Sequence, residues 1–192
     1  MIDLQTGDAL ILVDIQHDFL PGGALAVAGG NQVIGSANGC ITRFTAHGFP
    51  VVATRDWHPA NHCSFKPRGP WPPHCVVGTH GAAFADDLNL PDDVIIVSKA
   101  DKRDVDAYSG FRETILHARL QALGIRRLFV GGLATDYCVL NTVTDALNLG
   151  YRVMLLTDAI RAVNLRPGDG ECAVANMISA GADAIRSEQI AC

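Results

Sequence analysis

One cysteine of the sequence occupies a position that would activate it as a nucleophile. Cys138 comes a short glycine-containing turn after the apolar run Leu128–Val130 and precedes an amphipathic helical pattern. Near a helix N-terminus, exposed backbone N–H groups and the helix dipole stabilise a thiolate. The same N–H groups can hold an oxyanion. The position of Cys138 therefore predicts acyl transfer through sulfur, with a buried structural thiol as the alternative.

Asp14 and Lys99 are candidates to work with this thiol. Asp14 follows the apolar run Ala9–Val13, and Lys99 follows Val94–Val97. In an open parallel sheet, ligands bind outside the carboxyl ends of the strands, so both side chains are expected at the same edge as Cys138. An acid and an ammonium group at that edge favour the nucleophile over the structural thiol. No histidine is placed to act as the base for Cys138.

A second group of residues has the character of a metal site. Asp56 and His58 follow the apolar run Val51–Thr54, and their i, i+2 spacing puts them on one side of an extended backbone. His74 lies on a segment stiffened by two prolines. Two imidazoles and one carboxylate leave coordination positions open, as a catalytic metal site requires. We expect one divalent ion here, zinc, with iron and manganese as alternatives.

The other histidines have weaker signals. His62 and Ser64 are close enough in sequence to supply a further ligand or to orient one. An Asp-x-His pair is also found in ordinary solvated loops, which is the alternative for this segment. The remaining histidines are expected on the surface or in the core, and they are His17, His47, His80 and His117.

Aromatic residues accompany these polar groups. Phe19, Trp71 and Tyr108 are predicted to lie on loops near the candidate site. Aromatic side chains around such a site can wall a flat heteroaromatic ring, which gains from stacking and apolar burial. Covering an edge of the core is the alternative role.

The strands and helices predicted to position these residues alternate along the chain. Short apolar runs typical of buried parallel strands occur at 9–13, 51–54, 94–97, 128–130, 153–156 and, more weakly, 184–185. Helical patterns lie between them, for example from Val33 to Phe44, from Leu116 to Leu123 and from Val139 to Leu147. This alternation predicts an α/β fold, a doubly wound, mostly parallel sheet of about six strands with helices on both faces. The proline-rich stretch Trp57–Leu90 has neither period, and a loop of that length is usually functional.

Composition limits the function further. The 192 residues carry 15 Lys and Arg against 20 Asp and Glu, a formal net charge of −5, and no basic run. Nucleic acids and anionic membranes are recognised by clustered positive charge, so we expect a small-molecule ligand, with homo-oligomerisation left open. At 48% hydrophobic and 18% charged residues, the chain is too apolar for a disordered protein. We expect one domain over residues 1–192.

The cysteines and the N-terminus bear on the compartment. The first residues show no secretory signal, and no apolar run approaches the ~18 residues of a membrane span. We therefore expect a cytoplasmic protein whose six cysteines are reduced. Three of them are expected to be core or surface thiols without a catalytic role, and they are Cys40, Cys172 and Cys192.

Five ordered segments resemble the isochorismatase-like cysteine hydrolases and, within them, the nicotinamidases. They are ALILVDIQHDF at 9–19, TRDWHP at 54–59, WPPHC at 71–75, AYSGF at 107–111 and GLATDYCV at 132–139. The strand-end acid, the strand-end lysine and the helix-start cysteine match the superfamily. The DWH and WPPHC segments match the nicotinamidase branch, in which the superfamily carries a metal.

The resemblance implies residue roles. It implies a catalytic triad of Asp14, Lys99 and Cys138, and a divalent metal on Asp56, His58 and His74. It further implies a cis peptide bond between Ala134 and Thr135 and an oxyanion hole formed by the N–H groups of Ala134 and Cys138. Substrate contacts are expected from Phe19, Trp71, Tyr108, Ala134 and Tyr137. Tyr137 is a departure, because some relatives have histidine there.

The implied activity is hydrolysis of nicotinamide to nicotinate and ammonia, a step of NAD salvage, with pyrazinamide as a further substrate. One alternative is a related carbamoyl or ureido amidohydrolase, which would need no anchor for a pyridine ring. An isochorismatase fits less well, because cleavage of a vinyl ether does not use the cysteine. The other alternative is a catalytically silent metal- or ligand-binding protein, since fold does not fix function.

Overall fold

The computed structural model describes residues 1–191 and contains one six-stranded sheet. Its strands are β1 (Asp8–Val13), β2 (Val51–Asp56), β3 (Ile95–Lys99), β4 (Arg127–Leu133), β5 (Arg152–Arg161) and β6 (Asp183–Ile185). They lie in the order β3-β2-β1-β4-β5-β6, and every neighbouring pair is parallel. The order reverses direction at β1, so the carboxyl ends of β1 and β4 flank the switch point at which open α/β sheets bind ligands.

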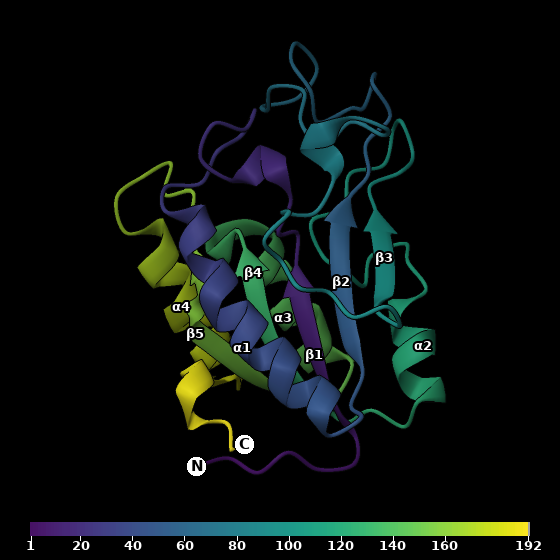
Figure 1. Cartoon of the computed structure of the whole chain (residues 1–192). Helices are drawn as coiled ribbons and strands as arrows, with labels where there is room; N and C mark the ends of the chain where they lie inside the picture. The colour runs from purple at the N-terminus through teal and green to yellow at the C-terminus, as the bar shows by residue number, and fades with distance from the viewer. Residues whose placement is uncertain (192) are drawn as a thin grey trace.

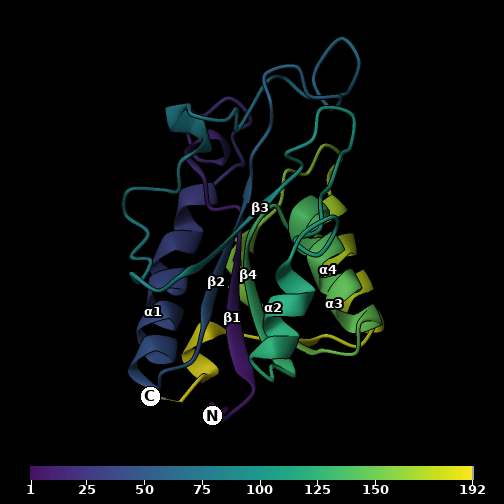
Figure 2. The ribbon, with the colours of Figure 1, turned by 90° about the vertical axis from the view of Figure 1, so that its right-hand side faces the viewer.

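Helices cover both faces of the sheet. They are α1 (Val33–Ala46), α2 (Leu116–Ala122), α3 (Leu140–Asn148) and α4 (Asp169–Ser179). Figure 2 shows α1 on one side and α2, α3 and α4 on the other. The doubly wound fold predicted from the alternating periods is therefore confirmed.

The alternation of side chains along β1 divides the core into two layers. Leu10 and Leu12 pack with the α1 side of the sheet, whereas Ile11 and Val13 pack with the α2 and α3 side. All six residues of β1 are buried, which explains the continuous apolar run Ala9–Val13 within it. Within the described residues, no helix has the length and apolar character needed to cross a membrane.

Several strands are longer than the sequence predicts, and the reason is pairing. β2 continues to Asp56 and β3 to Lys99, because the two strands pair up to the register partners Asp56 and Lys99. β4 continues to Leu133 beside β1 and β5. Gly132, with φ of 124°, makes this close approach possible, since a Cβ there would collide with the backbone of Val13.

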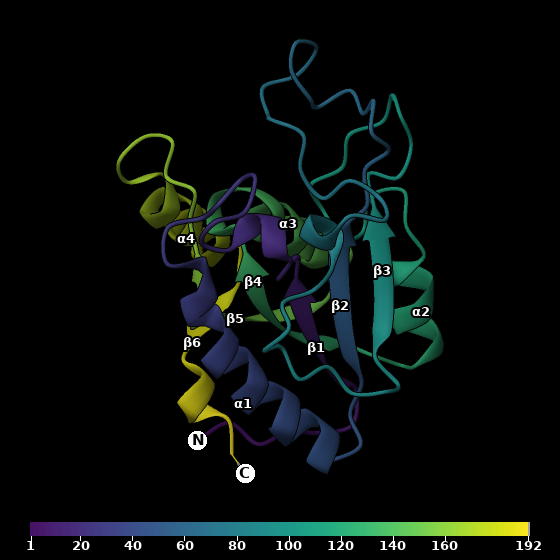
Figure 3. The same cartoon turned by 45° about the horizontal axis from the view of Figure 1, so that its top comes forward.

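The segment between β2 and β3 forms the loops above the carboxyl edge of the sheet (Figure 1). It contains a single 3-10 turn, His80–Ala82, and is tied down by isolated bridges between His58 and Val76 and between Phe65 and Trp71. A third bridge joins Phe84 to Gln16, just after β1. Seen from above the edge in Figure 3, these loops extend beyond the ends of β2 and β3.

Candidate active site

The predicted nucleophile, acid and lysine meet at the carboxyl edge of the sheet. The Lys99 ammonium nitrogen lies 2.9 Å from Oδ2 of Asp14 and donates a hydrogen bond of 3.4 Å to Sγ of Cys138. Asp14 directly follows β1 in a left-handed backbone conformation with φ of 49°. Such conformations in non-glycine residues concentrate at functional sites. All three side chains are buried, so water does not screen their interactions.

Burial sets the charge states of these groups. It raises the pKa of the Cys138 thiol well above its usual value, an effect that Lys99 only partly opposes. The helix-start position predicted a more acidic thiol, and desolvation of the sulfur outweighs that tendency. Burial also raises the pKa of Asp14, whereas Asp14 and Asp56 overcome burial to raise the pKa of Lys99. The thiol therefore holds its proton next to a carboxylate that can accept it.

Cys138 lies in a short π-helical turn, Thr135–Val139, which leads directly into α3. The cis peptide bond expected between Ala134 and Thr135 lies one residue earlier, between Leu133 and Ala134. The prediction was wrong by one bond because β4 runs on to Leu133, so the chain leaves the sheet there, and Thr135 already belongs to the helical turn.

Asp56, His58 and His74 form a compact, buried group beside the triad. Oδ2 of Asp56 lies 3.6 Å from Nε2 of His58 and 4.0 Å from Nε2 of His74. The other ring nitrogens face backbone carbonyls: Nδ1 of His58 is 3.2 Å from the Ala100 oxygen, and Nδ1 of His74 is 2.8 Å from the Pro72 oxygen. A carbonyl only accepts, so each Nδ1 donates and each Nε2 is left with its lone pair.

This arrangement fits a divalent metal ion. Nε2 of His58 is buried and finds no hydrogen-bond partner among residues 1–191, a costly situation that a ligated cation would relieve. Burial lowers the pKa of His74, which favours the neutral, ligating imidazole. For Asp56, burial would raise the pKa, but Lys99 and His58 hold it below its ordinary value. Two neutral imidazoles and a carboxylate are a suitable donor set for zinc.

His62 and Ser64 lie beside this group but interact with each other. Nδ1 of His62 is 2.7 Å from Oγ of Ser64, and its Nε2 is 3.2 Å from the Val105 carbonyl oxygen. The His62 ring packs 4.3 Å from that of His58, centroid to centroid. In this conformation both nitrogens of His62 are engaged, which suits a role in orienting His58 better than direct ligation.

The aromatic residues predicted to wall the substrate surround one small cavity. Trp71 donates a hydrogen bond of 3.0 Å from Nε1 to the Tyr108 hydroxyl, and its ring meets that of Tyr137 edge-on at 5.1 Å. The cavity is lined by Phe19, Leu25, Asp56, Trp71, His74, Tyr108, Ala134, Tyr137, Cys138 and Val163. It therefore joins the sulfur, two members of the metal-binding group and all the expected substrate contacts.

Three polar residues with a supporting role escaped the sequence analysis. Thr54 donates a hydrogen bond of 2.6 Å to Oδ1 of Asp14. The fully buried Gln16 carboxamide accepts from the Asp56 N–H at 2.8 Å and donates to the Asp56 carbonyl at 2.8 Å. Oδ2 of Asp18 accepts from the Cys75 N–H, next to His74, at 2.7 Å. Their signal in the sequence is a polar residue at or just after an apolar run.

Among residues 1–191, Cys138 is the cysteine that lines this cavity. The thiols of Cys40, Cys63, Cys75, Cys138 and Cys172 are all free. Cys40 is buried, which raises its pKa to about 12, whereas Cys172 is exposed. The expectation of reduced thiols agrees with this part of the chain, and Cys192 lies outside the described residues.

Comparisons with known proteins point in one direction. The family model described as "Isochorismatase domain" matches residues 8–189. The nicotinamidase of Escherichia coli is 41% identical over 91% of this chain and 92% of its own length. The structure of Pyrococcus horikoshii pyrazinamidase in complex with zinc superposes with a TM-score of 0.90 at 47% identity, covering 94% of this chain and 99% of that one. PnC1 from L. infantum in complex with nicotinate gives 0.88 at 37% identity, covering 97% and 96%.

Proposed function

Since this chain belongs to the isochorismatase domain family, we propose that it hydrolyses nicotinamide to nicotinate and ammonia and acts on pyrazinamide as well. The observation that carries the proposal is the contact of Lys99 with both Cys138 and Asp14, directly beside the Asp56, His58 and His74 group. A nucleophile, its base and a metal-binding group then face one aromatic-walled cavity. That combination suits a planar heteroaromatic carboxamide.

Catalysis starts with a proton transfer. Asp14, whose pKa is raised by burial, takes the proton of the Cys138 thiol, and the thiolate attacks the carboxamide carbon. The N–H groups of Ala134 and Cys138 hold the oxyanion of the tetrahedral intermediate. Asp14 then gives its proton to the departing ammonia, leaving a thioester on Cys138. Water attacks the thioester as Asp14 takes one of its protons, and the bond between the acyl carbon and the Cys138 sulfur breaks. Asp14 returns the proton to the sulfur, and nicotinate leaves after its acid proton passes to solvent.

Lys99 stabilises the negative charges that these reaction steps require. Two carboxylates and a developing thiolate lie within reach of its ammonium group, 2.9 Å from Asp14, 2.5 Å from Asp56 and 3.4 Å from Cys138. Once Asp14 has accepted the proton of Cys138, the buried carboxylate that remains charged is that of Asp56. Without a cation, the new thiolate and this carboxylate would repel each other. The charge of Lys99 offsets this repulsion at low dielectric.

Asp56, His58 and His74 would hold the metal ion, for which we propose zinc. When bound, the ion would supply a Lewis-acidic anchor for the ring nitrogen of the substrate, and this anchor would orient the carboxamide toward the sulfur. Four aromatic side chains line the same cavity, and they exclude water and confine the substrate ring to a plane. They are Phe19, Trp71, Tyr108 and Tyr137. Specificity for a pyridine or pyrazine carboxamide thus combines a polar anchor with flat apolar walls.

The test is ammonia release by the purified protein from nicotinamide, before and after removal of metal with a chelator, and again after addition of zinc. We expect activity that falls on chelation and returns with zinc. If the zinc-loaded protein released no ammonia from nicotinamide, the proposal would be contradicted. Ammonia release from a ureido or carbamoyl compound by the metal-free protein would instead support the alternative amidohydrolase.

A further inference from the structure

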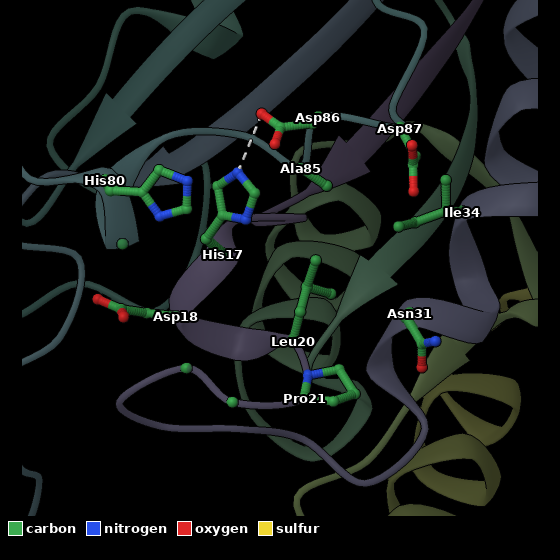
Figure 4. Close-up of a pocket in the computed structure, with 13 residues that line it drawn as sticks. His17, Asp18, Leu20, Pro21, Asn31, Ile34, His80, Ala85, Asp86 and Asp87 are labelled. Atoms are coloured by element: carbon green, nitrogen blue, oxygen red, sulfur yellow. Dashed lines mark hydrogen bonds and ion pairs between the residues drawn. The ribbon is translucent and has the colours of Figure 1, made fainter.

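A second group of metal-ligating side chains lies outside the proposed active site. It consists of His17, in the 3-10 turn after β1, His80, at the start of the 3-10 turn between β2 and β3, and Asp86. Figure 4 shows the two imidazoles side by side with the Asp86 carboxylate next to His17. Nε2 of His17 lies 3.3 Å from Oδ1 of Asp86, and the rings stack with centroids 4.0 Å apart.

The donor set is that of a transition-metal site. One ligand atom from each of His17, His80 and Asp86 lies within 4.8 Å of the others. His17 is half-buried, whereas His80 and Asp86 are exposed, so small rotations of these two side chains can bring the three atoms to the separation that a common ion requires. Solvent is available to complete the coordination. Two imidazoles and one carboxylate are the donors expected for zinc rather than magnesium, which prefers oxygen.

The surroundings also favour a cation. The three side chains line a cavity of about 540 Å³, shown in Figure 4. Among the described residues that line it, three are aspartates, Asp18, Asp86 and Asp87, and none is lysine or arginine. Asp18 accepts hydrogen bonds from the N–H groups of Cys75 and Ala24, so it contributes negative charge rather than a free ligand. Apart from the two histidines, the ionisable side chains that line the cavity are therefore acidic, which favours a divalent cation.

We propose that His17, His80 and Asp86 form a second, solvent-facing site for a divalent transition-metal ion such as zinc. It shares no residue with the Asp56, His58 and His74 group and does not depend on the proposed hydrolysis of nicotinamide. An ion there joins the turn after β1 to the segment 80–86, which lies within the long connection between β2 and β3. Clips that close long loops reduce the entropy of the open chain and stabilise the folded form.

The position of this site gives it a structural link to the active site. His17 lies between Gln16, which binds both the Asp56 backbone and the Ala82 carbonyl, and Asp18, which binds the N–H of Cys75. Holding His17 against the segment 80–86 would therefore steady the backbone at Asp56 and at Cys75, the residue after His74. The expected effect of occupancy is a more stable protein.

The test is zinc binding to the metal-stripped wild-type protein by equilibrium dialysis and calorimetry, with magnesium chloride as a comparison. We expect two zinc ions per wild-type chain and no competition from magnesium. His80→Ala should lose one of the two, or bind it at least about tenfold more weakly. Asp86→Asn should weaken the same site. His47→Ala, which removes an exposed histidine at the end of α1, should still bind two.

The two sites can be told apart. His58→Ala should lose the buried ion and keep the one at His80, whereas His80→Ala should keep the buried ion and its activity in ammonia release. Zinc should also raise the thermal unfolding temperature of His58→Ala more than that of the double variant His58→Ala/His80→Ala. Saturation of the wild-type protein at one ion, or undiminished binding of two ions by both His80→Ala and Asp86→Asn, would overturn the proposal.

Discussion

Lys99 and Asp56 form a buried ion pair in which Nζ lies 2.5 Å from Oδ1. The other oxygen of the same carboxylate, Oδ2, faces the Nε2 atoms of His58 and His74. Asp56 thus connects the two halves of the site. One of its carboxylate oxygens contacts the lysine of the proposed triad, and the other faces the two histidines. Asp14, 2.9 Å from Lys99, completes a cluster in which one cation serves two carboxylates.

Removing this cation is expected to damage both stability and chemistry. Lys99→Met leaves Asp14 and Asp56 buried without a counter-charge, which costs about 3–5 kcal/mol in the free energy of unfolding. Urea denaturation measures the loss of stability, and ammonia release should disappear with it. Lys102→Met, at an exposed lysine paired with Glu113, should unfold at nearly the same urea concentration as the wild-type protein, because solvent screens this pair. Equal stability of the two variants would show that the cluster does not need Lys99.

Cys138→Ala tests the proposed nucleophile. The variant should fold and bind metal, because the sulfur is not among the proposed ligands, while turnover of nicotinamide should fall by more than about a thousandfold. The control is Cys172→Ala, at an exposed thiol, which should keep wild-type activity. Near wild-type turnover by Cys138→Ala would rule out the thioester route.

His74→Ala tests the buried metal site through metal content. Elemental analysis should find about one ion per chain fewer than in the wild-type protein, because two remaining ligands bind weakly. His62→Ala is the matched comparison, since the nitrogens of His62 already face Ser64 and Val105. If His62→Ala lost the ion and His74→Ala kept it, the ligand set would have to be reassigned.

Ring analogues test how the substrate is chosen. Benzamide has the same carboxamide and nearly the shape of nicotinamide, but it has no ring nitrogen. A site built around a polar anchor rejects an analogue that lacks the partner group far more strongly than an apolar pocket rejects a small change in shape. The kcat/KM for benzamide should therefore be at least about a thousandfold lower, while pyrazinamide should be hydrolysed. Similar kcat/KM values for benzamide and nicotinamide would show that the metal does not anchor the ring. The substrate would then be oriented by Phe19, Trp71 and Tyr108 alone.

Asp158 predicts a pH-dependent contribution to stability. Burial would raise the pKa of this carboxyl, but hydrogen bonds from Ser187 and Ser36 hold it below its ordinary value, and they tie α1 and the C-terminal segment to β5. A depressed pKa stabilises the folded state above the unfolded pKa of about 4, and this stabilisation is lost as the pH falls through the folded value. Asp158→Ala should cost about 1–3 kcal/mol at pH 7.

The measurement for Asp158 is urea denaturation at pH 7 and near pH 3. The difference in stability between the wild-type protein and Asp158→Ala should narrow at the lower pH. Below the unfolded pKa of about 4, the unfolded state takes up a proton that the folded state, with its lowered pKa, binds less readily. Asp145→Ala provides a comparison at a helix-surface carboxyl. A deficit that stays constant across this range would mean that the hydroxyl contacts, rather than the charge, stabilise this corner.

The fold was predictable because its signals are local. Continuous apolar runs and helical periods alternate along the chain, and each strand end carries its polar residue with it, so Asp14, Asp56, Lys99 and Cys138 were expected at one edge. The amphipathic stripe of α1 and its stop before Gly48 follow from the same reasoning. The residue types at the strand ends were thus enough to predict which chemistry the edge could support.

Other features depended on contacts between segments far apart in the chain. The loop between β2 and β3 has no period, so only the tertiary structure shows that the ring of His74 contacts that of His58, and that the nitrogens of the adjacent His62 face Ser64 and Val105 instead. Burial by surrounding elements, which is not a property of neighbouring residues, decided that the Cys138 thiol keeps its proton. The carboxamide of Gln16 and the pairing of His17 with His80 and Asp86 likewise arise where the β1 turn meets that loop. Sequence periodicity reports the face that an element buries, whereas side-chain partners across loops are decided by three-dimensional packing.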